Sequence, residues 1–351
     1  MAEINPTVEE WKRLYAAAKQ VKEMAPWEWM AEDEVFGVQN PENDEIGFVS
    51  VMGAAGEHFS VALYPTPHAL YDFLELEEQG QLGLLGNVAP DRILEIPQLQ
   101  ASFEDREQLA KEDREVIKKL NLKFRGANNW PLFRSYAPGM FPWFLNSSEA
   151  RLLTAALEQL LDVAPRVRDN DVTLLGEEDD DEDFLVRVPR KENGRLVWED
   201  KVIRVPQPPA KTIAPAPLEP QLLEALKRLP KKGMALEMEL TMLPMPVREK
   251  KERPFFPYLL LIVETQSGLI LSTDMMEPQP SLEAMRATLP FKLAEAMSQL
   301  SAIPRVVVVR AETTASLLAP LAAELGIQIK LSPKLPSLDA ALKFMERMSP
   351  F

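Results

Sequence analysis

The residues best suited to catalysis are scarce in this chain, which contains two histidines and no cysteine among 351 residues. Without cysteine, the protein has no disulfides, cysteine nucleophiles, thiolate zinc sites or iron–sulfur clusters. Any triad that needs an imidazole depends on His58 or His68, and no spacing to serine and acidic residues predicts one. The sequence therefore predicts no catalytic residue and no cofactor.

One spacing suggests a metal site, and it overlaps the acidic run at residues 177–183. A loop of EF-hand length that starts at Asp169 has acidic or hydroxyl side chains at several ligand positions. Its sixth position is Leu174, where an EF-hand needs glycine, and its twelfth is Asp180, where an EF-hand needs a bidentate glutamate. We therefore expect a solvated acidic loop and no metal site.

The densest group of recognition side chains is the aromatic segment, residues 130–144. Its six aromatic residues are Trp130, Phe133, Tyr136, Phe141, Trp143 and Phe144. Six such side chains carry roughly 900–1,500 Å² at about 150–250 Å² each, whereas a soluble monomer rarely exposes an apolar patch beyond roughly 300–600 Å². Most of them must be buried, and two or three at most can line a groove.

Two interpretations of the aromatic segment stay open. It is either a corner of the core stiffened by proline or a surface whose aromatic planes and Arg134 grip a peptide or stack on a base. The candidate binding residues in this segment are Trp130, Arg134, Tyr136 and Trp143. A second motif, Pro26-Trp27-Glu28-Trp29, adds Trp27 and Trp29. Two interpretations stay open here as well: both side chains belong to the core, or one belongs to the core and the other forms a lid or contact.

The N-terminal block, residues 1–164, has the pattern of an α+β domain built on an antiparallel sheet. Thr7-Val-Glu-Glu10 matches a capping box, in which the Thr7 hydroxyl accepts from the amide of Glu10 and the Glu10 carboxylate reaches back. An amphipathic helix should follow it. Three short β-type runs bounded by turn residues then predict an antiparallel meander, at residues 35–39, 46–52 and 58–64.

The middle of the chain, residues 165–232, predicts a connector. It combines the acidic run, a β-hairpin and a linker that holds six prolines between residues 206 and 220. The hairpin should turn at Asn193-Gly194, because these residues adopt the positive φ angles of a two-residue turn. Proline makes the linker extended and semi-rigid.

The C-terminal block, residues 233–351, has the element order β-β-β-α-β-α-β-α. This order is similar to that of the RNase H-like fold of RNase H and of transposase and integrase cores. Residues 258–270 and 304–309 also resemble strands of integrases. The resemblance covers about a third of the chain and implies a scaffold that, in those enzymes, holds two Mg²⁺ ions with clustered carboxylates.

The carboxylates that the resemblance requires are not all present. Arg310 stands at the position of the acid on the fourth strand, and a guanidinium there would repel a metal ion. Glu239 matches the acid of the first strand, and Asp339 or Glu346 matches the last one. We expect the scaffold without the chemistry, since a fold does not imply a function.

The chain also resembles an uncharacterised bacterial family of paired domains of unknown function. The resemblance spans both blocks and rests on the motifs at residues 26–29, 35–38, 47–53, 130–139 and 142–143. It implies no established activity.

Charge and hydropathy set the expected compartment and partners. The net charge is −15, and the N-terminus has neither a basic nor an apolar region of a signal peptide. The longest strongly apolar stretch, residues 258–263, is far short of the ~20 residues of a membrane helix. We expect a cytoplasmic protein that binds no membrane, and nucleic acid is an unfavourable partner for its overall field.

These observations predict a non-enzymatic binding or adaptor protein with an inactive RNase H-like scaffold. Its partner is unknown, with a protein or peptide as the class to test. The alternative is a divergent, metal-dependent enzyme that processes nucleic acid.

Overall fold

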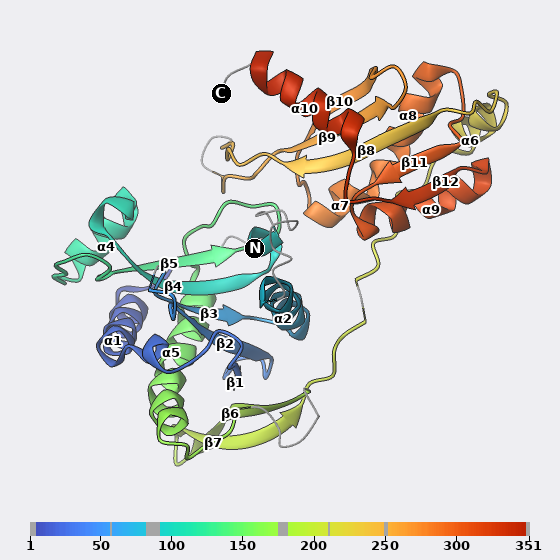
Figure 1. The fold of residues 1–351 in the computed structure, drawn as a ribbon. Coiled ribbons are helices and arrows are strands. Elements are labelled where there is room, and N and C mark those ends of the chain that lie inside the picture. Colours follow the sequence, from blue (N-terminus) through green and yellow to red (C-terminus); the bar gives the residue numbers. More distant parts are fainter. Residues whose placement is uncertain are drawn as a thin grey trace. The chain divides into compact units, whose positions relative to one another are not determined.

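The protein is described by a computed structural model that covers residues 5–56, 58–81, 92–174, 182–209, 211–248 and 252–348. It divides into two compact units. Unit 1 comprises Met1–Ala137 and Pro142–Pro209, and unit 2 comprises Pro138–Phe141 and Ala210–Phe351. Each unit contains one sheet and several helices, so the predicted mixed α+β class is confirmed (Figure 1).

Unit 1 is built on a seven-stranded sheet with the order β5-β4-β3-β2-β1-β6-β7. Every neighbouring pair is antiparallel except β1 and β6, which are parallel. The predicted meander is confirmed as β1, β2 and β3. The strands are β1 (Phe36–Gln39), β2 (Ile46–Met52), β3 (Ser60–Tyr64), β4 (Gln98–Glu104), β5 (Trp130–Tyr136), β6 (Asp183–Glu192) and β7 (Arg195–Arg204).

Helices cover both faces of this sheet. One face packs on α1 (Val8–Met24) and α5 (Ser147–Arg168) through a core that includes Leu14, Val61 and Phe133. The alternate strand residues face α2 (Pro67–Gln81), where Phe48, Tyr64 and Phe73 belong to a second core. The Thr7–Glu10 capping box that predicted the start of α1 is present. The shorter helices of this unit are η1 (Pro26–Glu28), α3 (Arg92–Glu95), η3 (Arg106–Gln108) and α4 (Lys111–Lys119).

The β6–β7 hairpin belongs to unit 1, whereas the sequence placed it in a connector. Its turn is the predicted one, with φ of 50° at Asn193 and 76° at Gly194. β6 can pair closely with β1 because residue 37 of β1 is a glycine. A Cβ atom on Gly37 would lie 2.7 Å from a methyl group of Val186 on β6, which is too close for a larger residue. The boundary expected at residue 164 therefore falls within α5, and the division into units comes after the hairpin.

Unit 2 is built on a five-stranded sheet with the order β10-β9-β8-β11-β12. β8, β9 and β10 are antiparallel, while β11 lies parallel to both β8 and β12. The strands are β8 (Ala235–Met242), β9 (Tyr258–Glu264), β10 (Ile270–Met276), β11 (Val306–Val309) and β12 (Gln328–Leu331). The helices are α6 (Pro220–Lys227), α7 (Leu282–Ala287), α8 (Leu289–Leu300), α9 (Glu312–Leu325) and α10 (Pro336–Met348).

The two faces of the second sheet pack on different helices. Leu261 and Val263 of β9 pack on Leu335 and Leu338 at the start of α10. The intervening Ile262 points to the opposite face and is also fully buried. The remaining helices cover that side (Figure 1). This arrangement brings α10 to the face on which Glu237 and Glu239 lie, because both pair in register with residues that contact α10.

Some sequence predictions fall outside the described residues. They are most of the acidic run, residues 177–181, and the side chain of Glu346. Within the described part of the chain, no helix has the length and apolar character needed to cross a membrane.

Candidate functional site

The aromatic segment does not form one cleft. Its first seven residues are β5, in which Phe133 is buried in the α1–α5 core, while Trp130, Arg134 and Tyr136 share the alternate face of the strand and are only partly buried. Trp130 also packs against the edge of that core. A strand rises about 3.3 Å per residue, so Trp130 and Tyr136 are separated by roughly 20 Å along β5. The three candidates on this face consequently have three separate environments.

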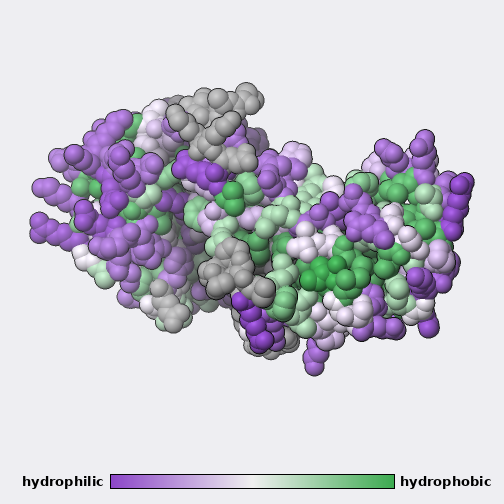
Figure 2. Space-filling model, turned by 90° about the horizontal axis from the view of Figure 1, so that it is seen from above, coloured by the Kyte–Doolittle hydropathy of each residue, from purple (hydrophilic) through white to green (hydrophobic). Residues whose placement is uncertain are grey.

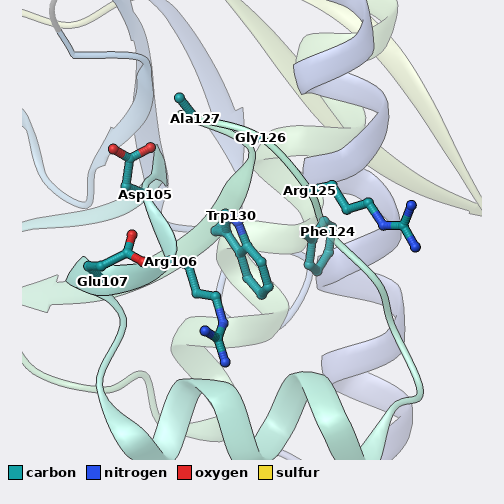
Figure 3. A pocket seen from close by; sticks show the side chains of 8 residues that line it. All are labelled: Asp105, Arg106, Glu107, Phe124, Arg125, Gly126, Ala127 and Trp130. Atoms are coloured by element: carbon teal, nitrogen blue, oxygen red, sulfur yellow. The ribbon is translucent and has the colours of Figure 1, made fainter.

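Trp130 lines a hollow, which we call the Trp130 hollow. It has a volume of about 470 Å³ and is wide open to solvent. Trp130 and Phe124 lie side by side with ring centroids 5.8 Å apart, and the Arg106 guanidinium carbon lies 5.9 Å from the Trp130 ring (Figure 3). The lining residues are Asp105, Arg106, Glu107, Phe124, Arg125, Gly126, Ala127 and Trp130.

Arg134 is held inside unit 1 by an ion pair. Its Nη1 and Nη2 atoms donate to the two carboxylate oxygens of Asp113 over 2.9 and 2.7 Å. Nη1 also donates to the carbonyl of Phe133, and the guanidinium lies 4.7 Å from the Phe144 ring. The side chains of Arg134 and Asp113 are only 13% and 10% exposed. A guanidinium with these partners joins α4 to β5 and is not available to a ligand.

Tyr136 begins a polar network that the sequence did not predict. Its hydroxyl donates to Oε1 of Gln100 over 2.8 Å, and this fixes the Gln100 amide with its nitrogen toward Ser60 and His58. That nitrogen lies 3.4 Å from Nε2 of His58, and Nδ1 of His58 lies 3.6 Å from Oε1 of Glu104. Burial raises the pKa of the Tyr136 hydroxyl, and the positive charge of Arg134 opposes this effect only in part.

This network joins β3, β4 and β5 and does not form a catalytic triad. The Gln100 amide contacts both His58 Nε2 and Ser60 Oγ, each at 3.4 Å, and so joins two groups that a triad would place in direct contact. Ser60 is also fully buried, which closes its hydroxyl to a substrate. No spacing in the sequence signals the network, because its members come from separate strands.

The rest of the aromatic segment is divided between the two units. Trp143 forms a pair of backbone hydrogen bonds with Ser135 and belongs to unit 1. The four residues Pro138–Phe141 belong to unit 2. There the Phe141 amide donates to the carbonyl of Pro254 over 2.9 Å, and the Phe141 and Phe256 rings lie 5.7 Å apart.

Trp27 and Trp29 pack in unit 1. Trp27 is 6% exposed and lies with Phe59 and Phe103 around the Lys22 ammonium, at 4.4–5.3 Å from that nitrogen to the three ring centroids. Trp29 is half-buried, and its Nε1 donates to the carbonyl of Ala164 over 3.0 Å. The two side chains therefore attach η1 to the sheet and to α5.

The acidic positions singled out in the C-terminal block meet Arg310 just beyond the last paired residues of β8 and β11. Arg310 donates from Nη1 to Glu239 over 2.9 Å and from Nη2 to Asp339 over 2.8 Å. Its Nε donates to the carbonyl of Pro333. Burial raises the pKa of Glu239, and the nearby Arg310 only partly opposes this effect. We call Glu239, Arg310 and Asp339 the Arg310 cluster.

The Arg310 cluster has the geometry of an ion-pair network. A cation already bridges the two carboxylates, and the side chain of Glu237 is occupied by the amide of Leu338, which donates to it over 2.8 Å. Among the described residues, no three histidine, cysteine or acidic side chains gather in a way that would hold a metal ion. The arrangement anchors α10 to the sheet.

Unit 2 also carries an exposed hydrophobic surface. Figure 2 shows hydrophobic side chains gathered on this unit, in contrast with the mostly hydrophilic surface of unit 1 in the same view. Its large exposed hydrophobic side chains include Met275 at 62% and Phe344 at 61% exposure. Contiguous exposed apolar surface on a soluble protein is typical of interaction sites.

Comparison with protein families gives two matches that follow each other along the chain. The family model of a domain of unknown function (DUF7309) matches residues 11–187, and that of a second one (DUF6930) matches residues 222–346. No curated protein matches the chain. The expected pair of domains of unknown function is therefore present. Because the first match covers more than half of the 351 residues, the chain belongs to the DUF7309 family.

Proposed function

We propose that this chain is a non-enzymatic binding or adaptor protein whose C-terminal domain is an RNase H-like scaffold without a metal site. The element order of unit 2 and its sheet order, with β8 between β9 and β11, support the scaffold. Glu239 of β8, the residue after β11 and the first turn of α10 lie together in this arrangement, as a carboxylate cluster would require. A cytoplasmic location and a bacterial origin belong to the same proposal.

The observation that carries the proposal is the position of the Arg310 guanidinium. It hydrogen-bonds Glu239 and Asp339, the two acids that a metal-dependent active site would use. Two-metal catalysis needs carboxylates that converge on divalent cations, and a guanidinium among them supplies the positive charge instead. The carboxylates are therefore paired with a cation that cannot coordinate a water molecule and lower its pKa as a divalent metal ion does.

The Trp130 hollow supports a role in binding. It combines exposed charged groups with two partly exposed aromatic rings on a rigid sheet edge. The exposed hydrophobic surface of unit 2 is a second indication of binding. The charged side chains of the hollow do not converge on a common point, as a catalytic site would require (Figure 3).

The proposal is tested by incubating the full chain with single- and double-stranded DNA and RNA in Mg²⁺ or Mn²⁺. We expect no cleavage by the wild type. Cleavage that depends on the metal and is lost in Glu239→Gln would overturn the proposal and favour the divergent nuclease. Cleavage that persists in Glu239→Gln would indicate a contaminating enzyme, and a repurified sample must then show none.

The binding role is tested by the accessibility of Trp130 to acrylamide. We expect the wild type to lose more of its tryptophan emission to this neutral quencher than Trp130→Phe does. Trp27→Phe is the matched control, because its indole is buried and should contribute little to the accessible emission. Equal accessible fractions in the wild type and Trp130→Phe would remove the hollow as a contact surface.

A further inference from the structure

The floor of the Trp130 hollow suits a planar side chain. Trp130 and Phe124 present neighbouring rings, and both are only partly buried. Aromatic rings prefer offset or edge-on partners with centroids about 4.5–7 Å apart, so a third ring from a ligand would extend the pair. The hollow is too open to enclose a small molecule and instead resembles the place where one side chain of a larger partner docks.

The walls of the hollow carry free positive charge. Arg106 and Arg125 are exposed, and neither guanidinium has a hydrogen bond or ion pair with any residue that the structure describes. Residues 105–125 contain seven Lys or Arg against five Asp or Glu, in a chain whose net charge is −15. One of the five, Asp113, is buried against Arg134. This stretch of the chain, part of which lines the hollow, is consequently more basic than the protein as a whole.

We propose that the Trp130 hollow binds an acidic peptide segment that carries an aromatic side chain, an inference that rests on the binding role proposed above. The ligand ring packs on Trp130 and Phe124. Its flanking carboxylates pair with Arg106 and Arg125, whose planar guanidinium groups accept carboxylates in a bidentate geometry. The partner is thus a protein region in which one aromatic residue has acidic residues on both sides.

A peptide fits the hollow better than a nucleic acid does. The lining of the hollow holds two acidic and two basic side chains, Asp105, Glu107, Arg106 and Arg125, and so offers two separate positive charges and no continuous basic track for a phosphate backbone. A polynucleotide adds a negative charge at every residue, and the field of this acidic protein opposes its approach. A short peptide brings a few carboxylates that two arginines can match.

The test is a titration of the full chain, labelled with ¹⁵N in its tryptophan indoles, with a blocked pentapeptide of one phenylalanine between two pairs of acidic residues. Trp130→Phe assigns the Trp130 indole signal. We expect that signal to shift saturably while that of Trp27, assigned in the same way, stays in place. A second peptide with alanine instead of phenylalanine should bind more weakly, and so should the first peptide at high salt.

Charge reversal supplies the decisive comparison. The double variant Arg106→Glu/Arg125→Glu should raise the Kd at least tenfold. Arg195→Glu, an exposed arginine at the hairpin turn, is the matched control and should change the Kd less than twofold. Because none of these guanidinium groups has a hydrogen bond or ion pair with a residue that the structure describes, the variants should keep the circular dichroism spectrum of the wild type.

Four results would overturn the inference. The Trp130 signal does not shift at about 5 mM peptide, where a Kd near 1 mM would give strong saturation, or a peptide with lysines in place of the acids binds with equal affinity. The third is an unchanged Kd in the double variant Arg106→Glu/Arg125→Glu, and the fourth is tighter binding of a thymidine pentanucleotide. None of these results would by itself overturn the proposed function. That proposal is overturned by different results, namely metal-dependent cleavage or a Trp130 that acrylamide cannot reach.

Discussion

Arg310 and Glu239 are neighbours across two parallel strands, and their side chains are joined by a 2.9 Å hydrogen bond. The register explains the contact: Val309 of β11 pairs with Met238 of β8, so the next residue on each strand is Arg310 and Glu239. Glu239 is 13% exposed at its side chain, and Arg310 is 34% exposed. The guanidinium therefore neutralises a carboxylate that the fold keeps largely out of water.

Replacing Arg310 by alanine should lower the free energy of unfolding by about 1–3 kcal/mol, because the buried carboxylate loses its charged partner. The measurement is urea unfolding followed by circular dichroism. Burial already raises the pKa of Glu239, so its unpaired carboxylate can take up a proton more readily at low pH. The loss of stability should consequently be larger at pH 8 than at pH 5.

Two further variants show whether this loss belongs to the pair. Arg305→Ala removes an exposed arginine nearby in the sequence and should change the stability by less than about 0.5 kcal/mol. Adding Glu239→Gln to Arg310→Ala should restore part of the lost stability, since it removes the unpaired charge. A double variant less stable than Arg310→Ala would contradict the account.

Arg310→Asp should convert the Arg310 cluster into a metal-binding site. The substitution places a third carboxylate between Glu239 and Asp339, and repulsion among the three is relieved by a divalent cation. We expect Mn²⁺ to raise the Tm of this variant and to leave that of the wild type unchanged. Isothermal titration calorimetry gives the same comparison directly, with Arg310→Asn as the control that removes the guanidinium without adding a charge. Equal Mn²⁺ effects on the Asp and Asn variants would show that the three positions do not converge.

Local signals in the sequence predicted much of each unit, and contacts between distant residues account for what it missed. The Thr7–Glu10 box and the Asn193-Gly194 turn act within a few residues, and both are present. The pairing of β6 with β1 joins residues that are about 150 positions apart and depends on the small size of Gly37. No periodicity in a single segment reports such a pairing, which is why the hairpin was expected in a connector.

The same limit applies to the candidate site. Residue types pointed to Trp130 and Arg134, but their roles depend on partners from other segments. Asp113, 21 residues before Arg134, turns that arginine into an internal ion pair. Glu104 and Gln100 give His58 a network for which the sequence has no motif. Arg310 is the exception, because the resemblance to the RNase H-like fold already put this arginine at the position of an acid.

Arg134→Ala should destabilise unit 1 by about 3–5 kcal/mol, because it leaves Asp113 as a buried charge without its partner. The free energy of unfolding in urea measures the effect. Arg114→Ala removes an exposed arginine from the same helix as Asp113 and should cost less than about 0.5 kcal/mol. At urea concentrations below its unfolding midpoint, where it is folded, the Arg134→Ala variant should still bind the acidic peptide with a Kd within twofold of the wild type. A large rise in that Kd would show that Arg134 contributes to peptide binding and not only to the stability of unit 1.

Glu10 should make unit 1 sensitive to acid. Burial raises the pKa of the Glu10 carboxyl, but hydrogen bonds from Ser147, the Thr7 amide and Arg151 outweigh it and lower the pKa from 4.5 to about 2. Because the pKa is depressed in the folded protein, the stabilisation is complete above pH 4.5 and is lost as the pH falls toward 2. Glu10→Gln should therefore be less stable than the wild type at pH 7, and the difference should shrink through this range.

The neighbouring Glu9 provides the matched control for this pH dependence. Its side chain is 85% exposed and lies 3.6 Å from Lys12, so Glu9→Gln should follow the wild-type stability curve at every pH. Urea midpoints at half-unit steps between pH 2 and 7 resolve the two cases, because the slope of stability against pH counts the protons taken up on unfolding. If the wild type and Glu10→Gln lost stability in parallel below pH 4.5, the acid sensitivity would arise from carboxylates other than that of the α1 cap.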